Sequence, residues 1–315
     1  MSARWAKVTV PLLLASVVGC SFESPSMRSQ CVASLLAGQS ELRHGIAVFD
    51  DVDGNVSQSS GDWVARYRLI FDRPLPAASL SKPIVASEIR RLMLAGKLSL
   101  DDAVVDELPS ARKDIKDNAH AGIRIRHLLQ HAAGFDRNLS GDALWMDNFP
   151  NPPQASCANA ADLVLRRPLD FSPGQRVAYS NAGYCLLGQV LLTKSELSAR
   201  DRSFLESPLG AAGGWTSTPS DLHARLKQSL PLAHIDDAIA LPDGSHYDYG
   251  WRHSPRTDEG PEWTHFGRLP GLLTLAVTDG QGKLLVAYFD GDPDDVDLSA
   301  STLSRDAWKC MRLSR

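Results

Sequence analysis

Strand-like patterns stand at both ends of this chain, and helical patterns fill the stretch between them. Short runs of apolar, β-branched and aromatic residues bounded by Gly, Pro or Asp predict strands at residues 44–49, 63–71, 262–267, 271–279 and 283–290. Apolar residues at helical spacing predict helices at 27–42 and from about Leu298, with mostly helices and loops from about 97 to 235. Strands from both ends that share one sheet predict an α/β (α+β) fold.

We therefore expect one domain, 27–315, with two lobes. The α/β lobe is discontinuous and takes residues from about 27–80 and 240–315. The stretch of about 81–239 forms an inserted, all-helical lobe.

The first twenty residues have the pattern of an export signal. Arg4 and Lys7 precede an apolar run that is too short to span a bilayer, and Gly19–Cys20 follows it. This end resembles a bacterial lipobox, so we expect a signal peptide at 1–19, a lipidated Cys20 and a tether at 20–26. Ser21 then favours an outer-membrane lipoprotein facing the periplasm. An ordinary cleaved signal with an incidental Cys is the alternative.

Charge and motifs exclude several classes of function. The net charge of −4 comes from 37 acidic and 33 basic side chains that are mixed along the chain, without the basic stripe that nucleic-acid binding requires. No other apolar run is long enough to cross a membrane. Zinc-protease and cysteine–histidine spacings, the P-loop and the dinucleotide fingerprint are all missing from the sequence. We therefore expect no metal and no cofactor.

Four further cysteines remain in a chain that is expected to reach an oxidising compartment. They are Cys31, Cys157, Cys185 and Cys310, and they allow three connectivities. If the first and last helices pack together, Cys31–Cys310 and Cys157–Cys185 are the natural pairs. Four buried free thiols are the alternative.

Ser79 and Lys82 form an S-x-x-K motif just after a proline-rich break. A Ser hydroxyl is a weak nucleophile until a neighbour takes its proton, and a Lys three residues along a helix lies on the same face. Pro83 suits a first helical turn. The motif alone is weak, because Ser110–Lys113 matches it as well, and on this motif alone a plain helix cap is the better explanation of Ser79. Of the two matches, only Ser79 follows a predicted strand and opens an amphipathic helix, so Ser79 is the candidate for a reactive serine.

Two later motifs have the residue types that would complete such a site. Tyr179-Ser180-Asn181 places a phenol and an amide together, and a phenol acts as a base near neutral pH only beside cations. His265-Phe266-Gly267 lies on a predicted strand, where Gly lets a substrate approach the backbone. Each motif alone also fits an ordinary buried residue or turn.

Together, Ser79–Lys82, Tyr179–Asn181 and His265–Gly267 resemble the class C β-lactamase and penicillin-binding-protein-like family of serine hydrolases. The likeness covers roughly residues 30 to 310. It extends to the runs His127–Phe135, Phe171–Gly174, Tyr179–Tyr184, Ala212–Trp215, Ser220–Leu222 and Tyr249–Trp251. The resemblance implies a β-lactamase/transpeptidase-like fold, with an antiparallel sheet flanked by the terminal helices.

The resemblance also implies a role for each matching residue. Ser79 is expected to be the nucleophile, Lys82 its activating partner and Tyr179 the general base and acid. Asn181 would contact Lys82 and the substrate, and His265 would position it. Gly267 would admit the substrate, and the backbone N–H groups of Ser79 and Arg268 would form the oxyanion hole.

His265-Phe266-Gly267 departs from the Lys-Thr-Gly of genuine class C β-lactamases, because it lacks a permanent cation and a hydroxyl. We therefore expect an esterase, a D-amino-acid peptidase or a D,D-carboxypeptidase that forms an acyl-enzyme. Its substrate would be a small molecule or a peptide, including fragments of peptidoglycan. A true β-lactamase and a catalytically silent envelope binding module are the alternatives.

Overall fold

The computed structural model describes residues 25–51, 54–108, 115, 118–144, 156–230, 232–254 and 260–313. The predicted signal peptide, the lipidation site Cys20 and the second S-x-x-K match at Ser110 lie outside these residues.

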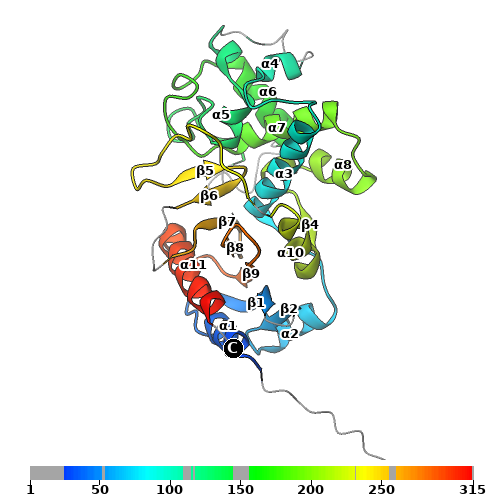
Figure 1. The fold of residues 1–315 in the computed structure, drawn as a ribbon, viewed down its shortest axis with the longest axis vertical. Helices are drawn as coiled ribbons and strands as arrows, with labels where there is room; N and C mark the ends of the chain where they lie inside the picture. Colours follow the sequence, from blue (N-terminus) through cyan, green and yellow to red (C-terminus); the bar gives the residue numbers. More distant parts are fainter. Residues whose placement is uncertain are drawn as a thin grey trace, which may run out of the picture.

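A single antiparallel sheet of seven strands runs from just above the middle of Figure 1, at β5 and β6, down to β1 and β2 near the bottom. Its strand order is β2-β1-β9-β8-β7-β6-β5, so strands from the two ends of the chain lie side by side, as predicted. The strands are β1 (Arg43–Asp51), β2 (Gly54–Ser59), β5 (His246–Asp248), β6 (Trp251–His253), β7 (Trp263–Leu269), β8 (Leu272–Thr278) and β9 (Leu284–Asp290).

Side chains of the central strands alternate between two hydrophobic clusters, because successive residues of a strand point to opposite faces. On β8 and β9, Leu273, Leu275, Leu285 and Ala287 are buried against the terminal helices. These helices are α1 (Met27–Ala37) and α11 (Val296–Arg312), which contact each other across the same face of the sheet (Figure 1). The intervening residues, such as Val286, join the larger cluster on the opposite face.

The opposite face carries α10 and the start of the helical lobe. Helix α10 (Pro219–Lys227) contacts β1 and β9, although it falls within the stretch expected to be the helical lobe. Apart from α2 (Trp63–Ile70), which lies beside β1 and β2, the remaining helices gather in the upper half of Figure 1. They are α3 (Ser81–Leu94), α4 (Val104–Glu107), η3 (Asn118–Gly122), α5 (Ile125–Leu129), α6 (Cys157–Arg166), α7 (Asn181–Lys194), α8 (Ala199–Glu206) and α9 (Gly210–Gly213).

The structure contains both predicted disulfides. Cys31–Cys310 joins α1 to α11 with a Cα–Cα distance of 5.4 Å. Cys157–Cys185 joins α6 to α7 inside the helical lobe, with a Cα–Cα distance of 5.1 Å.

The prediction of a strand at residues 63–71 is wrong, because this stretch forms helix α2 (Trp63–Ile70). Asp62 caps the helix by accepting a hydrogen bond from the Ala65 N–H, which satisfies a backbone donor that a helix start leaves free. Trp63, Tyr67 and Ile70 are exposed on its outer side. Their spacing is helical, and their aromatic and β-branched composition misled the strand prediction.

Among the described residues, every helix is too short or too polar to cross a membrane.

Candidate active site

Ser79 lies in a short turn between the two lobes. Strand β3 (Leu75–Pro76), which pairs with β4 (Thr216–Ser217), leads into the 3₁₀ turn η1 (Ala78–Leu80), and α3 follows from Ser81. The helix thus begins two residues later than expected, with Ser79 in the turn before it. Ala78 has a φ of 50°, a left-handed conformation that is rare for a residue with a Cβ.

Trp215 and Ser81 hold this turn in place. The backbone N–H of Ala77 donates to the Trp215 carbonyl oxygen at 2.8 Å. The Ser81 hydroxyl donates to the Ala78 carbonyl oxygen at 2.7 Å and accepts from the Trp215 N–H at 3.0 Å. These bonds fix the backbone on both sides of Ser79, whose side chain is partly exposed.

Lys82 is fully buried one turn after Ser79. Its Nζ donates to Ser79 Oγ at 3.1 Å, to Asn181 Oδ1 at 2.9 Å and to the Ala212 carbonyl oxygen at 2.6 Å. Burial lowers the pKa of Lys82 to about 7, and the negative charge of Asp142 opposes part of this shift. The amine is therefore poised to exchange a proton near neutral pH.

The three contacts of Lys82 are not equivalent. Asn181 Oδ1 and the Ala212 carbonyl oxygen can only accept hydrogen bonds, so each requires an N–H of Lys82. A neutral amine has two N–H groups and one lone pair. With both N–H groups used in this way, the lone pair faces Ser79 Oγ, which is the orientation that deprotonation of Ser79 needs.

Tyr179 faces the same serine. Its phenol is hydrogen bonded to the Ser79 side chain, and Lys82 Nζ lies 5.0 Å from the centre of its ring. Burial is the largest influence on the pKa of Tyr179 and raises it well above the ordinary value. The neutral phenol is therefore the favoured form, rather than the tyrosinate that the sequence suggested.

Two residues that the sequence analysis missed support this pair. His131 stacks on the ring of Tyr179 with 4.2 Å between ring centres, and its Nδ1 accepts from the Ser180 N–H at 3.2 Å. Asp142 accepts from the Asn181 N–H at 2.7 Å at the start of α7. His131 lies in one of the runs that carry the family resemblance, whereas Asp142 is in an irregular loop with no sequence signal.

The free edge of β7 lies next to Ser79. In the described part of the chain, β6 pairs with β7 only at Trp263 and Thr264, and the rest of β7 contacts η1 instead. A Cβ on Gly267 would lie 2.6 Å from the Ser79 backbone nitrogen, a distance that side-chain carbons do not reach. The absence of a side chain at Gly267 therefore lets the strand approach the serine.

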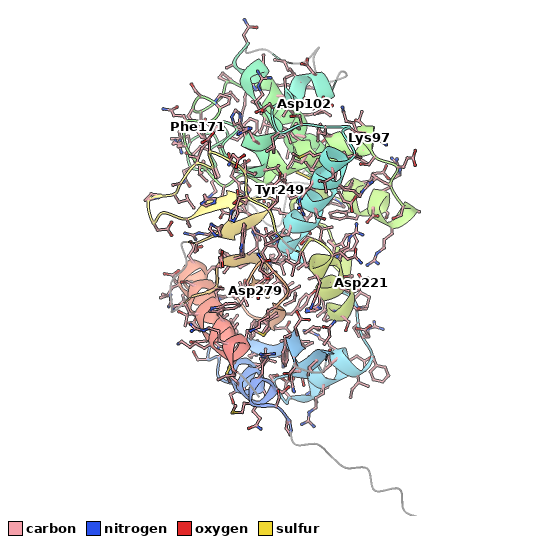
Figure 2. All side chains as sticks on the ribbon, in the orientation of Figure 1. Lys97, Asp102, Phe171, Asp221, Tyr249 and Asp279 are labelled. Atoms are coloured by element: carbon pink, nitrogen blue, oxygen red, sulfur yellow. A yellow bond between two sulfur atoms is a disulfide. The ribbon has the colours of Figure 1, made fainter. Side chains whose placement is uncertain are left out.

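His265 is buried on β7 with 4% of its surface exposed. Its ring is hydrogen bonded to the backbone of Gly250, and its Nε2 has no hydrogen-bond partner among the described residues. Burial, followed by the nearby charge of Lys82, lowers the pKa of His265 to about 3, so the ring is neutral near pH 7. Gly250 packs on the backbone of Lys82. The residue before it, Tyr249, is labelled near the junction of the lobes in Figure 2.

These residues open into one cleft of about 980 Å³ between the lobes. The side chains and backbone that line it come from both lobes. They include Ser79, Arg137, Tyr179, Asn181, Tyr247, Arg252, His265, Phe266 and Arg268. Of the predicted catalytic and substrate-binding residues, Ser79, Tyr179, Asn181, His265 and Arg268 line this cleft. Lys82 and Gly267 do not line it but lie against Ser79.

The beta-lactamase family profile matches residues 43–207, which is more than half of the chain. A protein of Dichelobacter nodosus named as a fimbrial assembly protein, FimD of serogroup H1, is 29% identical over 85% of this chain and 80% of its own length. Esterase EstB of Burkholderia gladioli is 30% identical over 53% of this chain and 43% of its own length.

Solved structures confirm the fold. The D-amino acid amidase from Ochrobactrum anthropi, solved with D-phenylalanine, superposes with a TM-score of 0.69 at 16% identity, over 92% of this chain and all of its own. The antiparallel sheet, the helical lobe and the serine turn between them define a β-lactamase/transpeptidase-like fold. The chain belongs to the beta-lactamase family, a family of serine hydrolases.

Proposed function

We propose that this chain is a hydrolase that cleaves an amide or an ester through an acyl-enzyme on Ser79. The contact between Lys82 Nζ and Ser79 Oγ, at 3.1 Å, carries the proposal. It joins a buried amine with a pKa of about 7 to the hydroxyl that reaches the cleft. A base with a pKa near the working pH is the most effective one for this step.

Acylation begins when the neutral Lys82 takes the proton of Ser79. Ser79 Oγ then bonds to the carbonyl carbon of the substrate, and the carbonyl electrons move onto its oxygen. The backbone N–H groups of Ser79 and Arg268 stabilise that oxyanion, as such donors do in a pocket that excludes water. The close approach of Gly267 to the Ser79 nitrogen supports this placement.

Collapse of the tetrahedral intermediate breaks the bond to the leaving group. Tyr179 donates its proton to the leaving nitrogen or oxygen and regains one from Lys82, which holds the proton of Ser79. Water then attacks the carbonyl carbon of the acyl-enzyme and gives up a proton along the same route in reverse. The bond between the acyl group and Ser79 breaks, and Ser79 Oγ recovers a proton. Burial of Tyr179 favours a phenol that relays protons in this way, with Lys82 as the resting base.

Small esters and D-amino-acid amides are the substrates that this site favours over β-lactams. A β-lactam carries a carboxylate, and neutral His265 with the apolar ring of Phe266 offers neither a charge nor a hydroxyl to hold it. Loss of a charged hydrogen bond costs about 1.5–3 kcal/mol, which is roughly one to two decades in rate. Arg268 lines the cleft and could offset this loss, as could Arg137 and Arg252, which line it too. The name of the EstB relative agrees with an esterase.

We also propose that the protein lies outside the cytoplasm, as a lipoprotein anchored through Cys20. Two disulfides favour an oxidising compartment. The relatives named as fimbrial assembly proteins agree with a position in the cell envelope. Labelling with a palmitate analogue should mark the wild-type chain and not Cys20→Ala; equal labelling of both would exclude the anchor.

Intact-mass analysis tests the nucleophile. A fluorophosphonate or a fluorescent penicillin should add one adduct to the wild type and none to Ser79→Ala. Ser87→Ala is the matched control on α3, because its hydroxyl only donates to the Ile84 carbonyl oxygen; Ser110→Ala tests the second motif. An adduct that persists in Ser79→Ala would place the site elsewhere, and no adduct with either probe would favour a silent binding module.

Steady-state kinetics test the specificity. The ratio of kcat/KM for a p-nitrophenyl ester to that for nitrocefin should favour the ester. Replacing His265 and Phe266 by Lys and Thr should shift this ratio toward nitrocefin. A clear preference of the wild type for nitrocefin would instead identify a β-lactamase.

A further inference from the structure

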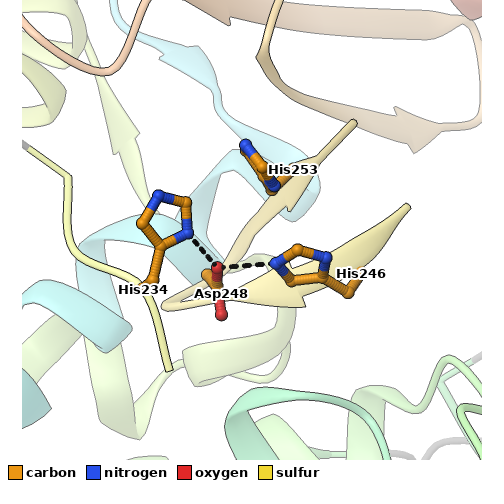
Figure 3. A group of neighbouring side chains, drawn as sticks. All are labelled: His234, His246, Asp248 and His253. Atoms are coloured by element: carbon orange, nitrogen blue, oxygen red, sulfur yellow. Dashed lines mark hydrogen bonds and ion pairs between the residues drawn. The ribbon is translucent and has the colours of Figure 1, made fainter. Parts of the chain in front are cut away.

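Three histidines and one aspartate meet beside the cleft, outside the proposed catalytic residues. They are His234, His246, Asp248 and His253, and one donor atom from each lies within 4.8 Å of the others. Figure 3 shows the three imidazoles arranged around the carboxylate of Asp248. The spacing of these residues matches no metal motif, which is why the sequence analysis expected no metal.

The sheet explains how the four side chains meet. His246 on β5 is the cross-strand partner of His253 on β6, so their side chains lie on the same face. Asp248 shares that face because it is two residues from His246. Tyr247 and Arg252, which are also paired, point the other way and line the cleft. His234 reaches the cluster from the segment before β5.

Two of the histidines already contact the same oxygen of Asp248. His234 Nδ1 and His246 Nε2 both lie 3.0 Å from Asp248 Oδ2. The Ile235 N–H donates to Asp248 Oδ1 at 3.0 Å, which turns the other carboxylate oxygen toward the histidines.

His253 completes the set. Its Nδ1 is buried and has no hydrogen-bond partner among the described residues. Its Nε2 lies 3.5 Å from Glu262, in the manner of the outer carboxylates that orient metal-binding histidines. The buried ring of Trp263 packs against His253 and His234, with 4.4 and 4.9 Å between ring centres, and forms an apolar wall.

The charge of the cluster also calls for a cation. Asp248 is fully buried, and its ion-pair partners within the described residues are His234 and His246 rather than a Lys or Arg. A buried carboxylate is costly without a compensating positive charge.

We propose that His234, His246, Asp248 and His253 bind one zinc ion or a similar borderline divalent cation. Imidazole and carboxylate ligands suit zinc, and four protein ligands are typical of a structural site with no open position. Ideal tetrahedral ligands lie about 3.3 Å apart at normal zinc distances, so the widest pair must close by roughly 1.5 Å. His234, whose side chain is 55% exposed, is the most exposed of the four residues and has the most room to rotate.

The ion has a mechanical role in this arrangement. It joins the segment of His234 to β5 and β6, the last two strands of the sheet. These short strands carry Tyr247 and Arg252 into the cleft wall. The ion therefore holds one wall of the cleft in place, and its binding does not depend on the proposed activity.

Calorimetry and visible spectroscopy on the purified full chain test the proposal. The protein carries no histidine tag, is stripped with a chelator and is then titrated with Zn²⁺, Co²⁺ or Ca²⁺. We expect one Zn²⁺ per chain, the intense visible bands of tetrahedral Co²⁺, no stoichiometric Ca²⁺ and a higher Tm with Zn²⁺.

Two matched variants locate the site. His234→Asn should weaken Zn²⁺ binding at least about tenfold and abolish the Co²⁺ bands. His44→Asn removes a histidine that pairs with Asp62 in the other half of the sheet, and it should bind as the wild type does. If His234→Asn fails to fold, His246→Gln takes its place.

Absence of stoichiometric Zn²⁺ binding by the wild type would overturn the proposal. Equal binding by His234→Asn and His44→Asn would also overturn it, because the ion would then lie elsewhere. Neither result bears on acylation of Ser79, which the mass experiment measures separately.

Discussion

Replacing Asn181 by Asp should shift the pH dependence of the enzyme toward alkaline pH. The substitution places a carboxylate where Asn181 Oδ1 now lies, 2.9 Å from Lys82 Nζ. A negative charge there favours the ammonium form, so the pKa of Lys82 rises. Only the neutral amine accepts the proton of Ser79, and the rising limb of kcat/KM therefore moves from about pH 7 to a higher pH.

The size of the shift follows from the distance. Two unit charges 2.9 Å apart interact by about 6 kcal/mol at an effective dielectric of about 20, which corresponds to roughly four pKa units. Desolvation of the new carboxylate offsets part of this energy. Repulsion by the Leu144 carbonyl oxygen, which now accepts from Asn181 Nδ2, offsets more. We expect a net shift of at least one unit, which lowers the neutral fraction of Lys82 at pH 7 at least about fivefold.

The assay is kcat/KM for a p-nitrophenyl ester from pH 5 to 10, corrected for spontaneous hydrolysis. Asn159→Asp makes the same chemical change on the exposed side of α6 and should leave the profile in place. Thermal unfolding of both variants checks that the fold persists. A limb that stays in place or moves to lower pH in folded Asn181→Asp would refute the assignment of Lys82 as the base.

Three other predictions concern the base Lys82, strand β7 beside Ser79, and the disulfide Cys31–Cys310. Lys82→Arg should lower the acylation rate by a factor of about 10²–10⁴, and the rate should not recover up to pH 10, because a guanidinium stays charged. Stopped-flow traces in which the acylation rate recovers at high pH would contradict this. Gly267→Ala should lower kcat/KM at least about tenfold, because the new Cβ would clash with the Ser79 backbone nitrogen. Gly282→Ala is the control, because its Cβ would meet nothing within 4 Å. Equal values of kcat/KM for the two variants would show that β7 can move to accept the Cβ. Removing Cys31–Cys310 by double Ser substitution should lower the free energy of unfolding in urea by about 2–5 kcal/mol, and an unchanged midpoint would show that the bridge adds no stability.

The sequence predicted the parts of the fold that have strong local patterns. Strand β7 alternates between buried and half-buried residues, and β8 and β9 are almost continuously buried apolar runs joined through glycine turns. Their predicted bounds agree with the structure to within two residues. The strand prediction for residues 63–71 was wrong because it relied on the β-favouring residue types and not on their helical spacing. Trp63, Tyr67 and Ile70 recur at helical intervals but are exposed on the outer side of α2, so the helix lacks the usual polar outer face that would have marked it as a helix.

The candidate site could be predicted where residues close in sequence carry it, as in Ser79 and Lys82. Asp142 could not be predicted from the sequence, because only the path of an irregular loop brings it to the start of α7. The histidine cluster was missed for a related reason. Strands β5 and β6 have three residues each, too few for a periodic pattern, and His234 joins them from outside the strands.

The bridge between α1 and α11 has a consequence for biosynthesis. Its two cysteines are 279 residues apart, so Cys31 emerges during synthesis long before its partner exists. The next cysteine to emerge is Cys157, whose own partner follows only 28 residues later. Oxidation in order of emergence would therefore trap Cys31 with Cys157. The native pairing requires Cys31 to stay reduced, or to be exchanged by an isomerase, until the last helix docks and β9 has paired with β1.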